Sequence, residues 1–161
     1  MSRSFGSVAE LAGATGDDLG WSAWHQVGQD VITAFAEATG DHQWIHVDQE
    51  RALGGPFGRT IAHGYYLLAV MPTLLGEIYR VDDVGSVINT GVDQLRFHRP
   101  VPAGSLIRAH ARMASVRVSR RGVAQLTVEV ALHVDGLAEP VCTALVHCMV
   151  RPGQPVATGS R

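Results

Sequence analysis

The chain of 161 residues contains no lysine, so all 13 of its basic side chains are arginines, and 15 acidic residues give it a net charge of −2. It lacks the strongly basic surface that attracts nucleic acids and anionic membranes, and we expect neither as a partner. Cysteine is also scarce, since only Cys142 and Cys148 occur, both in one strand-like segment. An extended chain would hold their α-carbons roughly 20 Å apart, which excludes a disulfide between them. We interpret both as reduced core residues of a cytoplasmic protein.

The sequence has no long hydrophobic run. Its longest apolar stretch, residues 65–75, is too short to span a bilayer and contains Pro72. The N-terminus has no basic segment followed by an apolar one, so we expect no secretory signal. The length suits one domain with one core, which we expect to comprise residues 1–161, with residues 152–161 forming a flexible tail.

The first half of the chain is mostly helical in its spacing. Apolar residues recur at helical intervals over residues 30–39, and Gly40 is suited to end that helix in a left-handed conformation. Residues 64–79 are apolar almost all round, which is typical of a buried helix, and the proline inside them predicts a kink. Residues 21–27 predict a first strand.

The second half has the composition and alternation of strands. Runs rich in β-branched residues alternate in part with polar ones, and turn residues separate the runs. The predicted strands are residues 86–98, 106–119, 123–135 and 141–150. One buried helix followed by long antiparallel strands predicts an α+β fold in which a sheet curls around the helix.

Residues 40–46 (GDHQWIH) contain the strongest functional signal. Asp41 and His46 place a carboxylate and an imidazole five positions apart, directly after the predicted helix. On a continuous helix they would be rotated by about 500° and would lie on different faces. If Gly40 ends the helix, the chain can turn and bring both groups together as a pair that transfers protons. The large apolar residues between them indicate a sheltered turn, where such pairs are typically functional. The alternative is that Asp41 only caps the turn and His46 lies on the surface.

His63 and Gly64 stand at the start of the predicted buried helix. Backbone N–H groups in the first turn of a helix have no partner within it, and a glycine there lets a ligand carbonyl approach closely. We therefore interpret Gly64 as an oxyanion-binding amide, with packing alone as the alternative. We interpret His63 as a residue that orients this turn. Arg59 and Arg99 are candidates to meet an anionic ligand tail, with solvated surface charge as the alternative.

A metal site is a further possibility, because Asp41, His42, His46 and His63 are ligand types for zinc. His42 and His46 would share a face of a continuous helix, but the turn predicted after Gly40 removes that arrangement, and no cysteine lies nearby. We expect neither a metal ion nor another cofactor.

Three segments of the chain resemble the MaoC-like (R)-specific enoyl-CoA hydratases, in the family's order. The segments are residues 35–48 (FAEATGDHQWIHVD), 61–64 (IAHG) and 95–104 (LRFHRPVPAG). The first is the specific signature and the other two support it. The resemblance is closest to the single-domain bacterial branch that includes the NodN-like proteins and the mycobacterial 3-hydroxyacyl-thioester dehydratases.

The resemblance implies a hot-dog fold, with a long central helix wrapped by a curved antiparallel sheet, and a homodimer. It implies that Asp41 and His46 are the catalytic pair and that the Gly64 amide binds the thioester carbonyl, with His63 and Gln43 as further substrate-binding residues. Gln43 stands where many members have asparagine, and its amide can likewise donate and accept hydrogen bonds.

The implied reaction is the reversible hydration of a trans-2-enoyl thioester to the (R)-3-hydroxyacyl thioester in fatty acid metabolism. The substrate would be carried by coenzyme A or by acyl carrier protein. Two alternatives remain open: a hot-dog acyl-CoA thioesterase, in which the same water attacks the thioester carbonyl, and a non-catalytic acyl-thioester-binding subunit. The Asp41 and His46 pair argues against the non-catalytic alternative.

Overall fold

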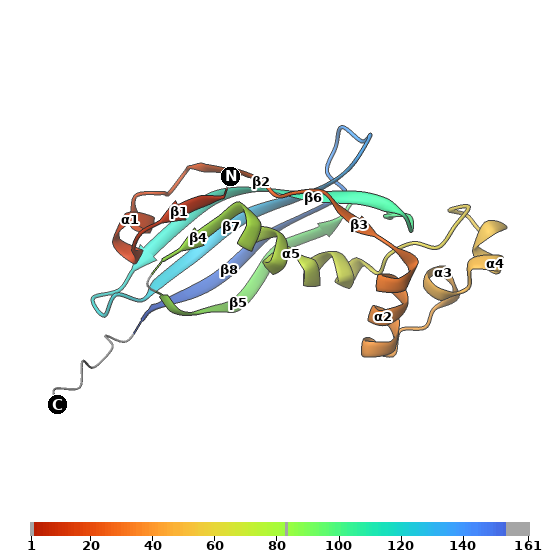
Figure 1. The fold of residues 1–161 in the computed structure, drawn as a ribbon, viewed down its shortest axis with the longest axis horizontal. Helices are drawn as coiled ribbons and strands as arrows, with labels where there is room; N and C mark the ends of the chain where they lie inside the picture. The colour runs from red at the N-terminus through yellow and green to blue at the C-terminus, as the bar shows by residue number, and fades with distance from the viewer. Residues whose placement is uncertain (1, 83, 154–161) are drawn as a thin grey trace, which may run out of the picture.

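The computed structural model describes residues 2–82 and 84–153, and its main feature is an antiparallel sheet of six strands (Figure 1). The strands are β2 (Asp18–Trp21), β3 (His25–Val27), β5 (Val84–Phe97), β6 (Ser105–Val118), β7 (Ala124–Val134) and β8 (Cys142–Pro152). Their order across the sheet is β2, β6, β7, β8 and β5, and β3 also pairs with β6. The four long strands lie where the alternation predicted them.

One long helix, α5 (Gly64–Ile78), runs along one side of this sheet (Figure 1). It buries five apolar side chains against the inward-facing residues of the strands: Leu67, Met71, Leu74, Leu75 and Ile78. Strand β7 shows the predicted alternation, because Leu126, Val128, Val130 and Leu132 are buried and the residues between them are not. Burying one such side chain fully is worth about 1.5–3 kcal/mol, so this contact stabilises the fold. The α+β hot-dog arrangement predicted from the sequence is confirmed.

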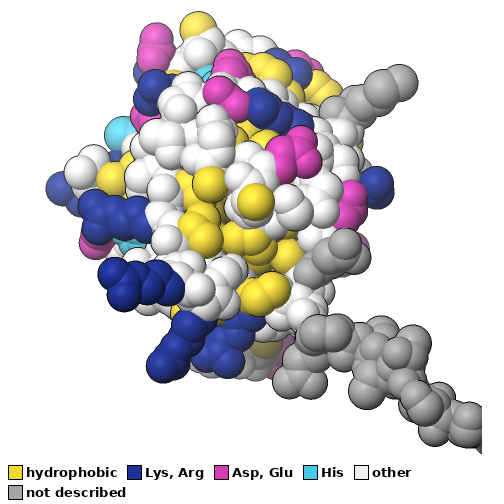
Figure 2. Space-filling model, turned by 90° about the vertical axis from the view of Figure 1, so that its left-hand side faces the viewer, with side chains coloured by type: hydrophobic (Ala, Val, Ile, Leu, Met, Phe, Trp, Pro, Cys, Tyr) yellow, Lys and Arg dark blue, Asp and Glu magenta, His cyan; other side chains and the backbone are white. Residues whose placement is uncertain are grey.

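The short N-terminal elements close one end of the core. Strand β1 (Arg3–Phe5) pairs in parallel with β4 (Tyr79–Val81), which directly follows α5, and α1 (Val8–Ala12) places Leu11 in the core. An apolar cavity of about 260 Å³ lies between α5, β4, β5 and β8 at this end. Figure 2 views the molecule from this end and shows hydrophobic side chains gathered in the middle of the face.

Three helices lie together at the opposite end (Figure 1). Helix α2 (Gln29–Thr39) ends as predicted at Gly40, which has a left-handed φ of 77° and donates its N–H to the Ala36 carbonyl at 2.8 Å. Helix α3 (Trp44–Val47) is a single turn. Helix α4 (Gln49–Leu53) begins after Asp48, whose carboxylate accepts the N–H of Arg51 at 3.0 Å and so satisfies a free donor of the first turn.

The prediction of one continuous strand over residues 21–27 is wrong, because the structure divides this segment between two strands. Strand β2 ends at Trp21 and β3 begins at His25. Between them, the N–H of Ala23 donates to the carboxylate of Glu77 on α5 at 3.1 Å. The segment between the two strands is therefore held both by β6, through the N–H of Ser22 and the Ala109 carbonyl, and by a side chain of α5.

The C-terminal boundary also differs from the prediction. Pro152, where we expected a flexible tail to begin, is the last residue of β8, and residues 154–161 lie outside the described residues. Cys142 and Cys148 are buried and free on β8, as expected, and burial raises the pKa of the Cys142 thiol to about 11. Among the described residues, no helix has the length and apolar character needed to cross a bilayer.

Candidate active site

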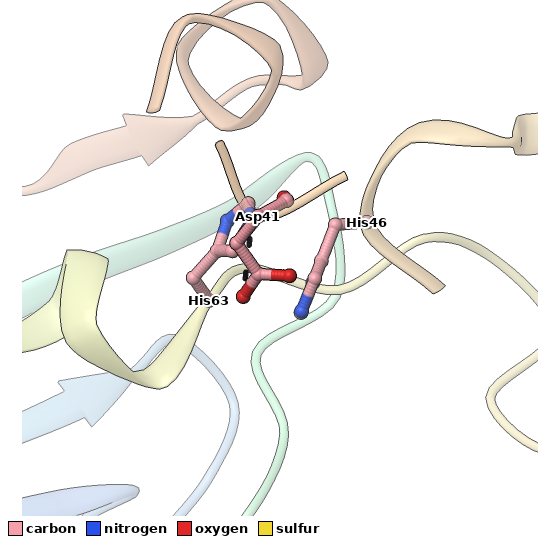
Figure 3. A group of neighbouring side chains, drawn as sticks. All are labelled: Asp41, His46 and His63. Carbon is pink, nitrogen blue, oxygen red and sulfur yellow. Dashed lines mark hydrogen bonds and ion pairs between the residues drawn. The ribbon is translucent and has the colours of Figure 1, made fainter. Parts of the chain in front are cut away.

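The structure brings Asp41, His46 and His63 together at the end of the molecule that carries α2 and α3 (Figure 3). One side-chain atom from each lies within 4.8 Å of the others. Asp41 follows the left-handed turn at Gly40, His46 lies on the single turn α3, and His63 is the residue before α5. The turn predicted after α2 thus places the carboxylate and the imidazole of the heptapeptide in one small volume.

His46 is buried, with 6% of its surface exposed, and its tautomer is set by the backbone. Its Nδ1 lies 2.7 Å from the carbonyl oxygen of Ile61, and because a carbonyl can only accept, Nδ1 carries the proton. Burial lowers the pKa of His46, the neighbouring His63 lowers it further, and the Ile61 bond and the Asp41 carboxylate oppose that shift. The imidazole is therefore neutral at neutral pH, with a free lone pair on Nε2 that can accept a proton.

His63 is buried more completely, at 2% exposure, and supports the other two residues. Its Nε2 donates to the backbone carbonyl of Asp41 at 2.9 Å, and its ring stacks on that of His46 with centroids 3.8 Å apart. The Asp41 carboxylate is 4.0 Å from the same nitrogen, which is beyond hydrogen-bonding distance, so the backbone contact is the real bond. His63 therefore holds the turn that carries Asp41, whereas from the sequence we expected it to orient the turn at the start of α5.

The other polar side chains of the heptapeptide are exposed, and among the described residues they make no hydrogen bond to this cluster. His42 is exposed and pairs with Glu37 on α2, with Nε2 and Oε1 3.0 Å apart, and this hydrogen bond raises the pKa of His42. Gln43 is exposed at the start of α3, and its side chain makes no hydrogen bond to the described residues. The carboxylate of Asp41 is half-exposed and receives only a long bond, 3.4 Å, from the Gln43 N–H. Asp41 is consequently free to bind another group.

Gly64 opens α5 beside a cavity of about 290 Å³. His46 and Gly64 both line this cavity, together with Ile61, Ala62, Leu67, Phe97, His98, Arg99, Pro100 and Val101, whereas Asp41 is not in its wall. One water molecule occupies about 30 Å³ of liquid, so the cavity has room for a group much larger than a single water. A side chain at Gly64 would place its Cβ 3.0 Å from the ring of Phe97, so close packing also requires glycine here. Both interpretations of Gly64, amide donor and packing residue, fit the structure.

The cluster is poorly suited to a metal ion. His46 uses Nδ1 and His63 uses Nε2 to bind backbone carbonyls, which leaves one nitrogen on each ring. The two rings are stacked with only 24° between their planes, so their remaining lone pairs run in nearly parallel planes. A tetrahedral zinc site needs lone pairs that converge on one point.

Three residues that hold His46 were missed by the sequence analysis. Gln29, the first residue of α2, donates from Nε2 to the His46 carbonyl at 2.8 Å, and its Oε1 accepts the buried hydroxyl of Thr60. Ile61 supplies the carbonyl that fixes the ring of His46. The heptapeptide gives no signal for these contacts, because they join segments 15 to 31 residues apart in the chain.

Comparison with known proteins gives a consistent set of relatives. The sequence model of the MaoC like domain family matches residues 10–135. The chain is 48% identical over 142 residues to 3-hydroxyacyl-thioester dehydratase Z of Mycobacterium tuberculosis, covering 88% of this chain and 94% of that protein. It is 34% identical over 140 residues to nodulation protein N of Rhizobium leguminosarum, covering 86% and 87%.

Solved structures share the fold. The MaoC-like dehydratase from Rhodospirillum rubrum superposes with a TM-score of 0.67 at 26% identity, covering 89% of this chain and 95% of that one. The R-hydratase PhaJ1 from Pseudomonas aeruginosa superposes with a TM-score of 0.70 at 19% identity, covering 92% and 86%. At that identity the likeness to PhaJ1 shows the fold alone.

Proposed function

The chain belongs to the MaoC-like family, and from that premise we propose that it catalyses the reversible hydration of trans-2-enoyl thioesters to (R)-3-hydroxyacyl thioesters. The observation that carries the proposal is the state of His46, a buried neutral imidazole whose free Nε2 is available beside Asp41, in the wall of a cavity that Gly64 also lines. The relative at 48% identity is named a 3-hydroxyacyl-thioester dehydratase, and removal of water from such a thioester is the reverse of hydration.

The proposed reaction starts with one water molecule held by both catalytic groups. A water that makes hydrogen bonds of about 2.8 Å can bridge two atoms up to about 5 Å apart, and the side-chain atoms of Asp41 and His46 lie within 4.8 Å. Nε2 of His46 takes one proton from this water as its oxygen adds to C3 of the substrate. The other O–H of the water donates a hydrogen bond to the Asp41 carboxylate and stays on the oxygen that becomes the 3-hydroxyl, and the same carboxylate stabilises the imidazolium that forms.

The second half of the reaction returns the proton. Addition at C3 moves negative charge to the thioester oxygen as an enolate, and in this proposal the N–H of Gly64, which lines the cavity, binds that oxygen. Losing one such donor typically costs about 2.7–4 kcal/mol of transition-state stabilisation. The imidazolium of His46 then gives its proton to C2, which completes the addition of water and regenerates the neutral ring.

We also propose that the protein is a homodimer that associates through β5. In the described part of the chain β5 pairs only with β8, so its other edge is open. Four of its apolar side chains are exposed, Val87 at 55%, Ile88 at 41%, Val92 at 37% and Phe97 at 43%. A long apolar edge left open invites pairing with another strand, and a second copy of β5 would cover it.

The carrier of the acyl group would be coenzyme A or acyl carrier protein, both of which end in a phosphorylated pantetheine arm. Arg99 lies in the cavity wall, and we propose that its cation meets the phosphate of that arm. We place the reaction in the cytoplasm, where the free thiols of Cys142 and Cys148 would stay reduced.

The test is an assay of purified protein with trans-2-enoyl-CoA substrates of graded chain length. Loss of the enoyl absorbance with formation of the 3-hydroxyacyl thioester is the expected result. Release of free thiol instead would identify a thioesterase, and tight binding without turnover would identify a non-catalytic binding subunit. Asp41→Asn should lower turnover by at least about 10²-fold, the low end of acid–base contributions.

A further inference from the structure

A hydrogen-bonded circuit behind the candidate site links three segments of the chain through the side chain of Gln29. We propose that Gln29, held in place by Thr60, is a positioning residue: it holds the backbone of His46 where Nδ1–H meets the Ile61 carbonyl, and through that bond it sets the direction of the imidazole. This inference rests on the proposed function, because it takes His46 as the proton acceptor. Neither residue touches the reacting atoms in this account.

The orientation of the Gln29 amide is determined by its partners. Its Nε2 donates to the backbone carbonyl of His46 at 2.8 Å, and its Oε1 accepts the hydroxyl of Thr60. The flipped amide would set its oxygen against the His46 carbonyl, two acceptors facing one another. Thr60 is only 2% exposed, so its hydroxyl depends on Gln29 for a partner. These two hydrogen bonds therefore hold the Gln29 amide in one orientation.

The circuit closes through the residue after Thr60. The N–H of Ile61 donates to the carbonyl of Ile45 at 2.9 Å, and the carbonyl of Ile61 accepts Nδ1 of His46 at 2.7 Å. Gln29 thus holds the backbone of His46, and Ile61 holds its ring, while Thr60 joins the two supports. Because Thr60 and Ile61 are adjacent in the chain, a shift of Gln29 would also change the hydrogen bond between Ile61 and the His46 ring.

Helix α3 needs this support because it has only four residues, Trp44–Val47. One turn of helix is unstable by itself, since nucleation fixes several residues for one hydrogen bond. Its C-terminal carbonyls also lack partners within the helix, and the amide of Gln29 satisfies the carbonyl of His46 from outside. Without it, both the carbonyl and the ring of His46 would gain freedom at the cavity wall.

Two substitutions at Gln29 separate positioning from mere folding. Gln29→Met keeps much of the volume and removes both hydrogen bonds, and we expect kcat to fall by about 10- to 100-fold with little change in KM, because misplacing a catalytic group by about 1 Å can cost 10²-fold. Gln29→Glu can donate to the His46 carbonyl only while its carboxyl is protonated. Its activity relative to the wild type should therefore rise as pH falls and decline as the carboxylate forms, a dependence that a structural defect would not produce.

Matched variants complete the test. Thr60→Ser keeps the hydroxyl and should retain the wild-type kcat, whereas Thr60→Val should reproduce the loss seen in Gln29→Met. Thr33→Val removes only the longer contact of the Gln29 amide, at 3.3 Å, and should leave kcat unchanged. Equal losses in Thr60→Ser and Thr60→Val, or a Gln29→Glu to wild-type ratio that does not vary with pH, would overturn the proposal.

A readout independent of turnover keeps this inference separate from the proposed function. The ¹⁵N chemical shifts of the His46 ring report its tautomer and pKa in the wild type and in Gln29→Met. We expect a single Nδ1–H tautomer in the wild type and a mixture with a changed pKa in the variant. If the wild type is inactive on enoyl thioesters but the shifts change as expected, the proposed function fails and the positioning role stands. Identical shifts in the two folded proteins would refute the positioning role.

Discussion

Replacing His46 with glutamine removes the group that accepts the proton and preserves much of its surroundings. The glutamine amide reaches about as far as Nε2 of the imidazole, so the Ile61 carbonyl loses the hydrogen bond that it accepts from Nδ1 at 2.7 Å. The amide cannot take a proton from water at neutral pH. The substitution therefore tests proton transfer with little change in packing.

The expected loss of kcat depends on the catalytic groups that remain in the variant. General acid–base catalysis contributes about 10²- to 10⁴-fold, which corresponds to about 2.7–5.4 kcal/mol at 1.36 kcal/mol for each factor of ten. In His46→Gln the Asp41 carboxylate can still orient water and the Gly64 amide can still bind the enolate. We therefore expect kcat to fall by at least about 10²-fold without being abolished, and KM to change much less.

The assay follows loss of the enoyl absorbance of crotonyl-CoA, with thermal unfolding to show that the variant is folded. His42→Gln is the matched control, because His42 lies in the same heptapeptide but is exposed and pairs with Glu37 at 3.0 Å. Its kcat should equal that of the wild type. A folded His46→Gln enzyme with near-normal kcat, or an equal loss in both variants, would refute the assignment of His46 as proton acceptor.

Three further predictions follow from the structure. Because burial lowers the pKa of His46 below 6.5, kcat/KM should be constant through neutral pH and should decrease as the pH is lowered into the acid range. The unfolded chain binds more protons than the folded one just below pH 6.5, so the free energy of unfolding should also decrease as the pH is lowered there. An increase of kcat/KM on lowering the pH through this range would contradict the account. Gly64→Ala would bring a Cβ to 3.0 Å from Phe97 and should lower stability by about 1 kcal/mol, the low end for overpacking, with Phe97→Leu restoring it in thermal unfolding; an unchanged single variant would disprove the clash. Ile88→Lys on the open edge should convert the proposed dimer to a monomer in light scattering, and an unchanged dimer would exclude association through β5.

Local chemistry made much of the fold predictable. Gly40 ends α2 because a left-handed φ of 77° is easily adopted by glycine, and this is a property of one residue. The alternation in β7 is equally local, since successive side chains of a strand face opposite sides and one side is the core. Such signals lie in a few adjacent residues and can be read without knowing the rest of the molecule.

Contacts between distant segments were not predictable. The stacking of His63 on His46 and the support from Gln29 depend on how α2, α3 and the start of α5 pack together. The hydrogen bond that holds the segment between β2 and β3 joins Ala23 to Glu77, which lies 54 residues further along the chain. Each of these polar groups is typical of an exposed residue in its own segment, and only packing gives it a partner.

The most direct test of the central claim is hydration of trans-crotonyl-CoA in D₂O by the wild-type protein, with chiral and isotopic analysis of the product. If His46 Nε2 takes a deuteron from the attacking water and returns it to C2, the product should be (R)-3-hydroxybutyryl-CoA with the hydroxyl and the deuterium added to the same face of the double bond. The (S) product, addition to opposite faces, or no hydration at all would contradict the account.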